Sequence, residues 1–455
     1  MWRRHVIVRS LQRDEISVAR FVEGFAGTVR SLLAGKIIVR VLLISSNNVT
    51  SGLETPLPLG LACVGAATEK AGHEVCMRVL SSEATWEAAI RNAISQLHPD
   101  VIGISIRNID DQDMQCVHFF LAPLQQLLVL CRKVSRAPIV LGGAGYSIFP
   151  GSALTFLGAD FGIQGEGEIA FPALLSWLKE GRQTAAPPGV YLPNRAAMQR
   201  SYVEKLDTLR LPEPRLWLDS TTDMAARVPV QSRRGCPLDC VFCSTSAIEG
   251  KPLRKRSPEL VVAWIAKVYA QGFRNFHFVD NTFNLPPSYA KDLCCRVIDS
   301  GLDLDWWAIV YPKWVDFELV QLMAKAGCTQ ISLGFESGSE PILQMLNKRF
   351  HRTDVQIISE MFADVGINRF GFLLLGGPGE TRDSVEESLA FAESLHLDYL
   401  KITVGIRIYP HTPLASLALA ERVVRPDDDL LVPRFYLAAS LRDWLPERVA
   451  QLVAS

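Results

Sequence analysis

The sequence has no excess of charge of either sign, and this removes one class of function. Lysine and arginine number 47, aspartate and glutamate number 48, and the formal net charge of the 455 residues is −1. A nucleic-acid-binding protein needs a clear basic excess to bind phosphates, so we expect no nucleic-acid partner. Long polar tracts are also missing and 48% of the residues are apolar, which predicts folded domains with a large core.

Long, uniformly apolar segments are missing as well. The longest uncharged stretch, residues 137–159, contains several glycines and Pro150, and it predicts a strand, a turn and a helix. Residues 1–35 mix arginines with Asp14 and Glu15 and lack the apolar centre of a signal peptide. We therefore expect a cytoplasmic protein without a membrane span, in which residues 1–35 form a helical or poorly ordered leader.

The cysteines do not follow the pattern of a disulfide framework, which belongs to short secreted domains. Of the ten, seven are scattered through apolar or helical segments, and we expect them to be small buried hydrophobic residues. The remaining three, Cys236, Cys240 and Cys243, lie in one short segment.

Short β-branched runs alternate with helical stretches from residue 36 onward, which predicts an α/β fold in two blocks. The strands expected in the first block cover residues 37–45, 74–79, 101–106, 139–141 and 161–163. The helices expected between them cover residues 59–71, 86–96, 112–133 and 169–180. This pattern predicts a doubly wound, Rossmann-like parallel sheet over 36–181, with ligands at the carboxyl ends of its strands.

Several prolines then predict a linker over 182–226, after which a second alternation begins. Its expected strands cover residues 228–232, 275–279, 306–310, 330–334, 370–375 and 401–406. Its expected helices cover residues 258–271, 288–300, 317–326, 354–365 and 384–394. Six such units predict a partial (β/α)6 barrel over 227–410, with chemistry at the carboxyl ends of the strands. Residues 411–455 are too few for another domain and are expected to close the barrel or its mouth.

The strongest motif directly follows the first barrel strand. Cys236, Cys240 and Cys243 have the spacing C-x3-C-x2-C. Three thiolates on one loop can ligate three irons of a [4Fe–4S] cubane and leave the fourth iron open to another ligand. The alternative, a structural zinc ion, needs a fourth closing ligand, and no second pair of cysteines or histidines lies nearby in the sequence. We therefore predict an iron–sulfur cluster.

With this motif the chain resembles the radical S-adenosylmethionine (SAM) superfamily, in which SAM chelates the open iron of the cluster. The resemblance implies that Phe242 lies against the adenine of SAM. Further SAM contacts are implied at the ends of the second, fourth and fifth barrel strands, namely at Asp280, Glu336, Ser337, Gly376 and Gly377.

Basic residues near these motifs have less specific interpretations. Lys348 and Arg349 are candidates for the SAM carboxylate. His411 stands after the sixth strand, where members of the superfamily usually carry glycine. The basic run formed by Lys251, Arg254, Lys255 and Arg256 favours a solvated face over an anion contact.

The order of doubly wound domain, linker and barrel resembles the cobalamin-binding branch of that superfamily. The resemblance implies that strand-end loops of the first domain hold cobalamin through Asn47, Pro56, Leu57, Ser105, Arg107, Asn108, Gly142, Gly143, Gly165 and Glu166. Residues 45–52 contain no histidine, so we expect cobalamin without a histidine lower axial ligand. Arg107 is expected to approach the lower face of the corrin or, alternatively, to pair with Asp110 or Asp111. A domain that has lost its ligand is the wider alternative.

The resemblance implies a class B-like, cobalamin-dependent radical SAM methyltransferase. One SAM would methylate cobalamin, and a second would give a 5′-deoxyadenosyl radical. That radical would activate an unactivated carbon of a small molecule or natural-product intermediate, which methylcobalamin would then methylate. An electron donor such as flavodoxin or ferredoxin is implied as a partner. The alternative is an enzyme with the same cofactors that catalyses cyclisation, ring contraction or oxidation without net methyl transfer.

Overall fold

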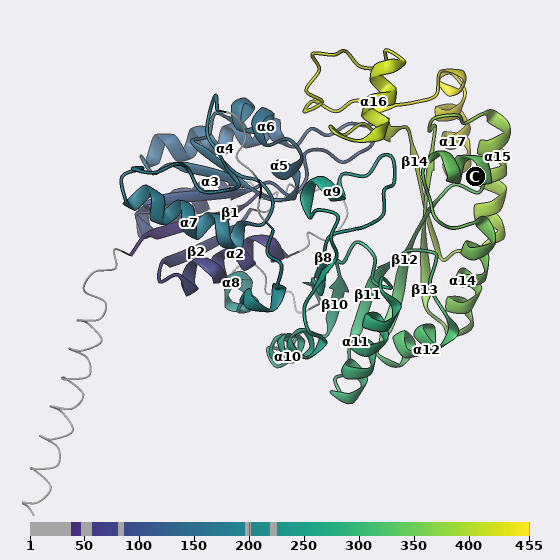
Figure 1. The fold of residues 1–455 in the computed structure, drawn as a ribbon, viewed down its shortest axis with the longest axis horizontal. Helices are drawn as coiled ribbons and strands as arrows, with labels where there is room; N and C mark the ends of the chain where they lie inside the picture. Colours follow the sequence, from purple (N-terminus) through teal and green to yellow (C-terminus); the bar gives the residue numbers. More distant parts are fainter. Residues whose placement is uncertain are drawn as a thin grey trace, which may run out of the picture. The chain divides into compact units, whose positions relative to one another are not determined.

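A computed structural model describes residues 38–46, 57–80, 86–195, 200, 202–218 and 225–454. All described helices and strands fall within residues 40–454 (Figure 1). The expected leader, residues 1–35, lies outside the described residues. No helix in the described ranges combines the length and apolar character needed to cross a membrane.

The first sheet has six strands in the order β2-β1-β3-β4-β5-β6. They are β1 (Arg40–Ser45), β2 (Glu74–Val79), β3 (Val101–Ser105), β4 (Ile139–Gly142), β5 (Phe161–Ile163) and β6 (Val190–Tyr191). The first five pair in parallel, whereas β6 runs antiparallel to β5. The strand order reverses between β1 and β3, and in doubly wound sheets this switch point is where ligands bind.

Helices cover both faces of this sheet (Figure 1). One group packs together as α2 (Leu59–Lys70), α7 (Gly167–Lys179) and α8 (Arg215–Leu218). The other contains α3 (Trp86–Leu97), α4 (Leu121–Val134) and α6 (Pro150–Leu157), with α5 (Ala144–Ile148) after β4. Because both faces are covered, β1 and β3 read as nearly continuous apolar runs, which is why their sequence predicted a doubly wound sheet.

The second sheet is a parallel array in chain order, β7-β10-β11-β12-β13-β14. Its strands are β7 (Val228–Val230), β10 (Asn275–Phe278), β11 (Asp305–Val310), β12 (Cys328–Glu336), β13 (Asn368–Leu375) and β14 (Tyr399–Val404). The helices that follow them are α10 (Pro258–Tyr269), α11 (Pro287–Asp299), α12 (Phe317–Lys325), α14 (Arg352–Asp364) and α15 (Arg382–Ser394). This arrangement confirms the predicted partial (β/α)6 barrel.

The two faces of the second sheet differ in burial. In β11, buried Trp306, Ala308 and Val310 alternate with partly exposed Asp305, Trp307 and Ile309. The Trp306 indole donates a hydrogen bond to the carbonyl of Ala326 at the end of α12, 2.7 Å away, so the buried face is the one that carries the helices. The partly exposed side chains therefore line the inner face of the barrel.

One predicted helix is wrong at its start. Residues 112–133 were expected to be helical, but α4 begins at Leu121. The carboxylates of Asp110, Asp111 and Asp113 each accept a hydrogen bond from the backbone N–H two residues later. Such side-chain turns compete with the helix for backbone donors, so residues 110–120 form a loop.

A second difference lies in the residues expected to form the linker. Val190 and Tyr191 add the antiparallel edge strand β6 to the first sheet. The segment between 182 and 226 therefore contributes to the first domain as well as connecting the two.

The C-terminal residues pack against both domains through one buried arginine. The segment contains β15 (Ile406–Arg407), α16 (Pro413–Ala420), β16 (Phe435–Tyr436) and α17 (Leu445–Ala454). Arg407 Nε donates to Asp110 of the loop after β3 at 2.8 Å, and its other nitrogens donate to the carbonyls of Ile408 and Leu430 at 2.6 and 2.9 Å. Both charged side chains are at most 2% exposed, so the loop after β3 and the C-terminal segment depend on each other.

We expect the Asp110→Asn and Arg407→Met variants each to lose about 3 kcal/mol of unfolding free energy, because each leaves a buried charge without its partner. Urea unfolding followed by circular dichroism measures the loss. The exposed pair Arg352–Glu387 is the control, and Arg352→Met should leave the midpoint nearly unchanged. Equal effects of the buried and exposed substitutions would contradict the attribution of these losses to an unpaired buried charge.

Candidate functional site

The three clustered cysteines lie on one loop between β8 (Arg233–Arg234) and α9 (Thr245–Ile248). Cys236 is buried, and Cys240 and Cys243 are partly buried. Gly235, which precedes the first cysteine, has a φ of +88°, and a Cβ atom there would lie 2.1 Å from the carbonyl oxygen of Pro252. Only glycine fits this position, so the turn that delivers Cys236 is set by the backbone.

This cysteine loop, residues 235–244, is held by segments that follow other barrel strands. The backbone N–H of Val241 donates to the carbonyl of Leu346, and the N–H of Leu414 donates to the carbonyl of Val241. The side chain of Asn347 donates to the carbonyl of Asp239 at 2.7 Å. Leu346 and Asn347 directly follow α13 (Glu340–Met345), so the loop is fixed by the ends of β12 and β14 together.

The three thiols suit a cluster better than a single metal ion. The pKa of the Cys236 thiol is raised to about 11. Burial is the main cause, and the neighbouring sulfurs of Cys243 and Cys240 also contribute, which indicates that the three lie close together. Within the described ranges, however, no three His, Cys, Asp or Glu side chains converge as ligands of one ion. Thiols that are near one another without meeting at a point fit the corners of a cubane rather than a closed zinc site.

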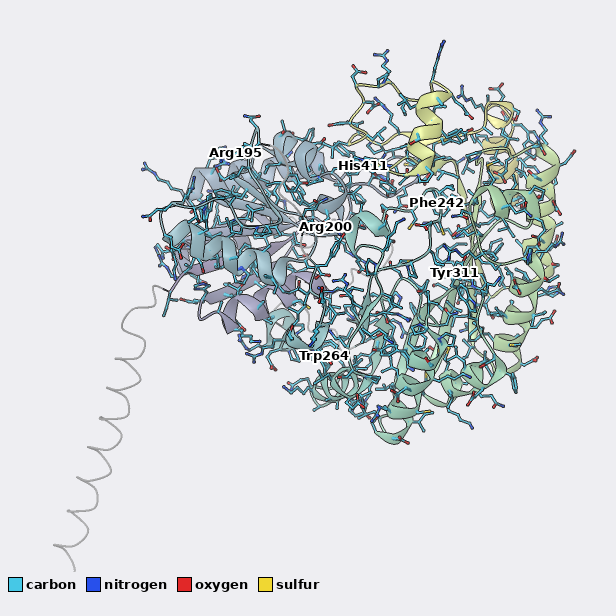
Figure 2. The ribbon with its side chains drawn as sticks, in the orientation of Figure 1. Arg195, Arg200, Phe242, Trp264, Tyr311 and His411 are labelled. Atoms are coloured by element: carbon cyan, nitrogen blue, oxygen red, sulfur yellow. The ribbon has the colours of Figure 1, made fainter. Side chains whose placement is uncertain are left out.

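Phe242, labelled in Figure 2, belongs to the cysteine loop and lies beside a largely buried charged pair. The ammonium of Lys348 lies 5.2 Å from the centre of the Phe242 ring and 3.2 Å from Glu336 Oε1. Burial lowers the pKa of Lys348, but the charges of Glu336 and Cys240 outweigh burial, and the net shift is upward. The structure thus brings three expected SAM residues together beside the loop, whereas Arg349 points to an exposed position near Asp239.

The Asp280 carboxylate is bound within the chain. It accepts hydrogen bonds from the backbone N–H and hydroxyl of Ser232, at 2.8 and 2.5 Å, and from the N–H of Arg233 at 3.1 Å. The side chain is fully buried. It holds the turn that joins β7 to β8, and the expected contact of Asp280 with SAM stays a prediction.

Ser337 is also occupied within the chain. Its hydroxyl lies 2.9 Å from that of Ser388 on α15 and accepts the N–H of Ser339 at 3.1 Å. The residue is fully buried. The hydroxyl of Ser337 therefore supports the strand end, and the expected contact of this residue with SAM stays a prediction.

The glycine-rich turn after β13 is filled by the chain itself. The N–H groups of Gly376 and Gly377 both donate to the carboxylate of Glu380. A Cβ atom at Gly376, whose φ is +94°, would lie 2.3 Å from the side chain of Leu437. The absence of a side chain at Gly376 thus makes room for the C-terminal segment, and the expected approach of SAM to this turn stays a prediction.

The residues expected to hold cobalamin meet at the carboxyl edge of the first sheet. The N–H of Ile106 donates to the carbonyl of Gly142 at 2.7 Å, and the N–H of Gly145 donates to the carbonyl of Ile106 at 3.0 Å. These bonds place Ser105 and Asn108 beside Gly142 and Gly143. The N–H of Gly165 donates to Ser147 Oγ at 2.8 Å, which adds the loop after β5.

The other expected cobalamin residues have different outcomes. Asn47 and Pro56 lie outside the described residues. Leu57 is partly buried at the start of α2. Arg107 is exposed at the sheet edge, and its expected alternative pairing is wrong, since Asp110 pairs with Arg407 and Asp111 pairs with His118.

The positive charge of Arg107 influences a histidine on the inner face of the barrel. The pKa of His277 on β10 is lowered to about 4, mainly by burial and in smaller part by the charges of Arg107 and Arg227. His277 packs edge-on against Trp307, with the ring centres 6.3 Å apart. The carboxyl edge of the first sheet therefore lies near the barrel interior, which contains a neutral imidazole at physiological pH.

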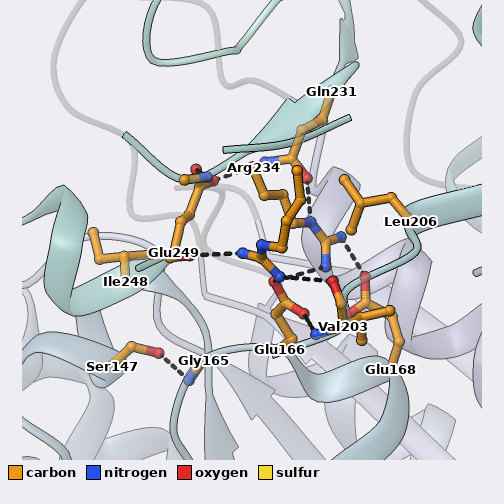
Figure 3. A network of polar contacts seen from close by, with 12 residues as sticks. Ser147, Gly165, Glu166, Glu168, Val203, Leu206, Gln231, Arg234, Ile248 and Glu249 are labelled. Carbon is orange, nitrogen blue, oxygen red and sulfur yellow. Dashed lines mark hydrogen bonds and ion pairs between the residues drawn. The ribbon is translucent and has the colours of Figure 1, made fainter. Parts of the chain in front are cut away.

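A buried network of opposite charges joins the first domain to the cysteine loop (Figure 3). Arg234, two residues before Cys236, donates to Glu168 at the start of α7. Arg254 on β9 (Arg254–Lys255) donates to Glu166 at 2.5 Å, and the N–H of Val203 donates to the same carboxylate at 2.6 Å. The carboxylate of Glu166 is thus bound within the protein, and the expected contact of this residue with cobalamin stays a prediction.

The basic run that contains Arg254, Lys255 and Arg256 has a strand-like spacing, and this spacing indicates which of its residues are buried. Arg254 and Arg256 are buried and Lys255 is exposed, which is the period-two alternation of a strand. Arg256 donates to the carbonyls of Leu206 and Leu209. The expected solvated face is therefore wrong for these two arginines.

Comparison with known proteins gives two family matches. Residues 230–392 match the radical SAM superfamily, and residues 48–175 match the B12 binding domain. An uncharacterized methyltransferase of Pyrococcus horikoshii is 28% identical over 81% of this chain and 79% of its own length. Tryptophan 2-C-methyltransferase of Streptomyces laurentii is 23% identical over 80% of this chain and 72% of its own.

A solved structure has the same fold. The radical SAM methyltransferase TsrM of Kitasatospora setae, with tryptophan and a SAM analogue bound, superposes with a TM-score of 0.79 and 21% identity. The superposition covers 91% of this chain and 88% of that protein. The doubly wound domain, the linker and the partial barrel thus form one known arrangement.

Glu380 makes stability depend on pH. Burial raises the pKa of its carboxyl group from 4.5 to about 7, and the N–H groups of Gly377 and Gly376 only partly oppose this. Between these values the folded protein keeps a proton that the unfolded chain has released, so the stabilisation is lost as pH rises through the window. In urea unfolding, the free energy of unfolding of the wild type should fall by up to about 3 kcal/mol between pH 5 and pH 8 because of this group. We expect the Glu380→Gln variant to lack this decrease.

An exposed glutamate on the neighbouring helix provides the control for this measurement. Glu393 lies on α15, and Glu393→Gln should keep the pH dependence of the wild type. A Glu380→Gln variant with the slope of the wild type would refute the assignment.

Proposed function

The chain is a radical SAM enzyme that carries a B12-binding domain, and on this premise we propose that it methylates an unactivated carbon of a small molecule. The cofactors of these domains are a [4Fe–4S] cluster, SAM and cobalamin. When bound, they supply the chemistry: reductive cleavage of SAM to a 5′-deoxyadenosyl radical, and relay of a methyl group through cobalamin.

The observation that carries the proposal is the buried charge network at the domain boundary. Glu168 and Glu166 follow the last parallel strand of the first sheet, and Arg234 and Arg254 flank the cysteine loop. Their ion pairs hold the strand-end loops of the first domain beside the cysteine loop. Methyl transfer to a carbon radical requires SAM and cobalamin to act on the same carbon of the substrate. Ion pairs that hold the two sets of loops side by side support this requirement.

In this proposal the cysteine loop holds the cluster through Cys236, Cys240 and Cys243. Phe242 packs against the adenine of SAM. Lys348 supplies a buried positive charge for the SAM carboxylate, and Glu336 keeps that ammonium in place at 3.2 Å. The pair is nearly excluded from solvent, with the lysine side chain 5% exposed, so water does not screen the interaction.

The carboxyl edge of the first sheet holds cobalamin in the same proposal. A Cβ atom at Gly142 would meet nothing closer than 3.8 Å, so this glycine leaves the backbone accessible, whereas Gly143 and Gly165 are needed for the approach of Ile106 and Arg200. Ser105 and Asn108 offer polar side chains, and Arg107 would lie beside the corrin. No histidine occurs in residues 45–52, so this loop offers no imidazole to cobalt.

The inner face of the barrel is apolar where it is farthest from the cysteine loop. Phe370 and Phe372 on β13 stack with ring centres 4.9 Å apart, and Tyr399 on β14 packs edge-on against Phe370 at 5.8 Å. Phe370 and Tyr399 pair at the amino ends of their strands. We propose that these rings close the inner face at that end, so that the substrate binds at the carboxyl ends of the strands.

The cluster assignment predicts a loss of iron. Anaerobically reconstituted protein should hold about four irons at this site, because the three thiolates are ligands of one cubane. The triple substitution of Cys236, Cys240 and Cys243 to alanine should abolish this iron. Cys294→Ala and Cys295→Ala should retain it. A normal cluster in the triple variant would sink the assignment.

The methyltransferase assignment predicts how SAM is consumed. One SAM donates methyl and another yields the radical, so S-adenosylhomocysteine and 5′-deoxyadenosine should form in near-equal amounts during turnover. The product should gain one methyl group, as mass spectrometry would show. An enzyme that cyclises, contracts a ring or oxidises would give 5′-deoxyadenosine without matching S-adenosylhomocysteine, and a product of unchanged carbon count would overturn the proposal.

A further inference from the structure

Arg233 is a buried arginine with a different environment from its neighbour Arg234. Both lie on the short strand β8, whose successive side chains point to opposite sides. Arg234 reaches the acidic residues of the first domain, whereas Arg233 reaches Asp280 and Tyr289 in the barrel. The side chain of Arg233 is 2% exposed.

The guanidinium of Arg233 has no hydrogen-bond acceptor in the described part of the chain. None of its three nitrogens has a partner. The nearest carboxylate oxygen, Asp280 Oδ2, is 3.9 Å from Nε, beyond hydrogen-bond distance. The Asp280 oxygens already accept bonds from the backbone N–H groups of Ser232 and Arg233 and from the Ser232 hydroxyl.

Tyr289 does not compensate for the missing acceptors. Its ring centre is 5.9 Å from the guanidinium carbon, at the limit of a cation–π contact. Its hydroxyl donates toward the carbonyls of Ser232 and Arg256. Asp280 offsets the charge of the guanidinium without accepting a hydrogen bond from it. A desolvated guanidinium with all its donors unpaired is costly, so a further negatively charged acceptor is expected in the working protein.

The cysteine loop provides a negative group at this position. Burial lowers the pKa of Arg233, and negative charge on Asp280, Tyr289 or Cys236 raises it. Arg233 lies three residues before Cys236, and the chain turns between them at Gly235, whose φ is +88°. Three thiolates outweigh the positive charge of a [4Fe–4S] core, so the assembled cluster would be a net anion whose negative charge grows on reduction.

We propose that Arg233 is the buried counter-charge of the cluster held by the cysteine loop, and that it raises the reduction potential of that cluster. The inference rests on the proposed cluster at Cys236, Cys240 and Cys243. One-electron reduction adds a negative charge to the cluster, and no bond forms or breaks. A fixed positive charge in a medium of low polarity favours the reduced state.

Lys255 provides a matched control on the same hairpin. It pairs with Arg233 across the β8–β9 ladder, and its ammonium lies 5.3 Å from the centre of the same Tyr289 ring. Lys255 is exposed, so solvent and salt screen its charge. The two cations therefore share a location but differ in burial.

The test is a redox titration with dithionite, monitored by electron paramagnetic resonance, on reconstituted full-length protein without SAM. Arg233→Met should shift the midpoint potential to a more negative value. Arg233→Lys should stay near the wild type, because it keeps the charge. Lys255→Met should titrate as the wild type does. Iron content is measured on every sample.

Each remaining outcome decides the inference. An Arg233→Met protein with full iron and an unshifted potential overturns it. Weakened SAM binding in equilibrium dialysis with an unshifted potential also overturns it, because Arg233 would then serve the SAM carboxylate. If Arg233→Met and Arg233→Gln both lose iron, the Arg233→Lys protein decides the question. Retention of iron in that protein supports a need for positive charge, and loss of iron from it overturns the inference. A wild-type protein without iron would instead overturn the cluster assignment itself.

Discussion

Two buried ion pairs at the domain boundary, Arg234–Glu168 and Arg254–Glu166, constrain everything built around the cysteine loop. Each of these side chains is at most 8% exposed, so each charge has lost most of its hydration and depends on its partner. Displacing the first domain would leave two guanidinium groups and two carboxylates unpaired in a medium of low polarity. The position of Cys236, two residues after Arg234, is therefore tied to the position of the first sheet.

The barrel adds restraints from three further directions. Leu346 and Leu414 bond to Val241 in the loop, Arg407 binds Asp110 of the first domain, and Asp280 holds the turn before β8. These contacts come from the ends of different strands, where parallel sheets collect their functional loops. The same residues that organise the loop are consequently unavailable as ligands. Charged side chains beside the site thus divide into those that support the backbone, such as Asp280, and those that lie beside the aromatic ring of the cysteine loop, such as Lys348.

Much of the architecture could be predicted from sequence because it depends on local patterns. The buried runs of β1 and β3 and the alternation in β11 set strand positions to within three residues, the largest difference being at the start of β1, and the spacing of the three cysteines indicated the loop. Individual contacts were less predictable. Nothing local to Asp280 shows that its carboxylate bonds to Ser232, which is 48 positions away. The start of α4 was misplaced because side-chain turns at Asp110 to Asp113 outweighed the helical pattern that follows them. The space at Gly376 is defined by Leu437, which no local pattern reveals.

The charge network at the boundary also bears on how such two-domain chains can diversify. The arginines on the barrel side and the glutamates on the first-domain side are complementary in number and position. Each half therefore depends on the other for the partners of its buried charges. A recombination event that joined this barrel to a different first domain would have to bring two acidic residues in the register of Glu166 and Glu168. Without them, Arg234 and Arg254 would remain as buried, unmatched cations next to the cysteines. The two halves should therefore be inherited together, and substitutions should be tolerated more readily elsewhere at the boundary than at the residues of the two ion pairs.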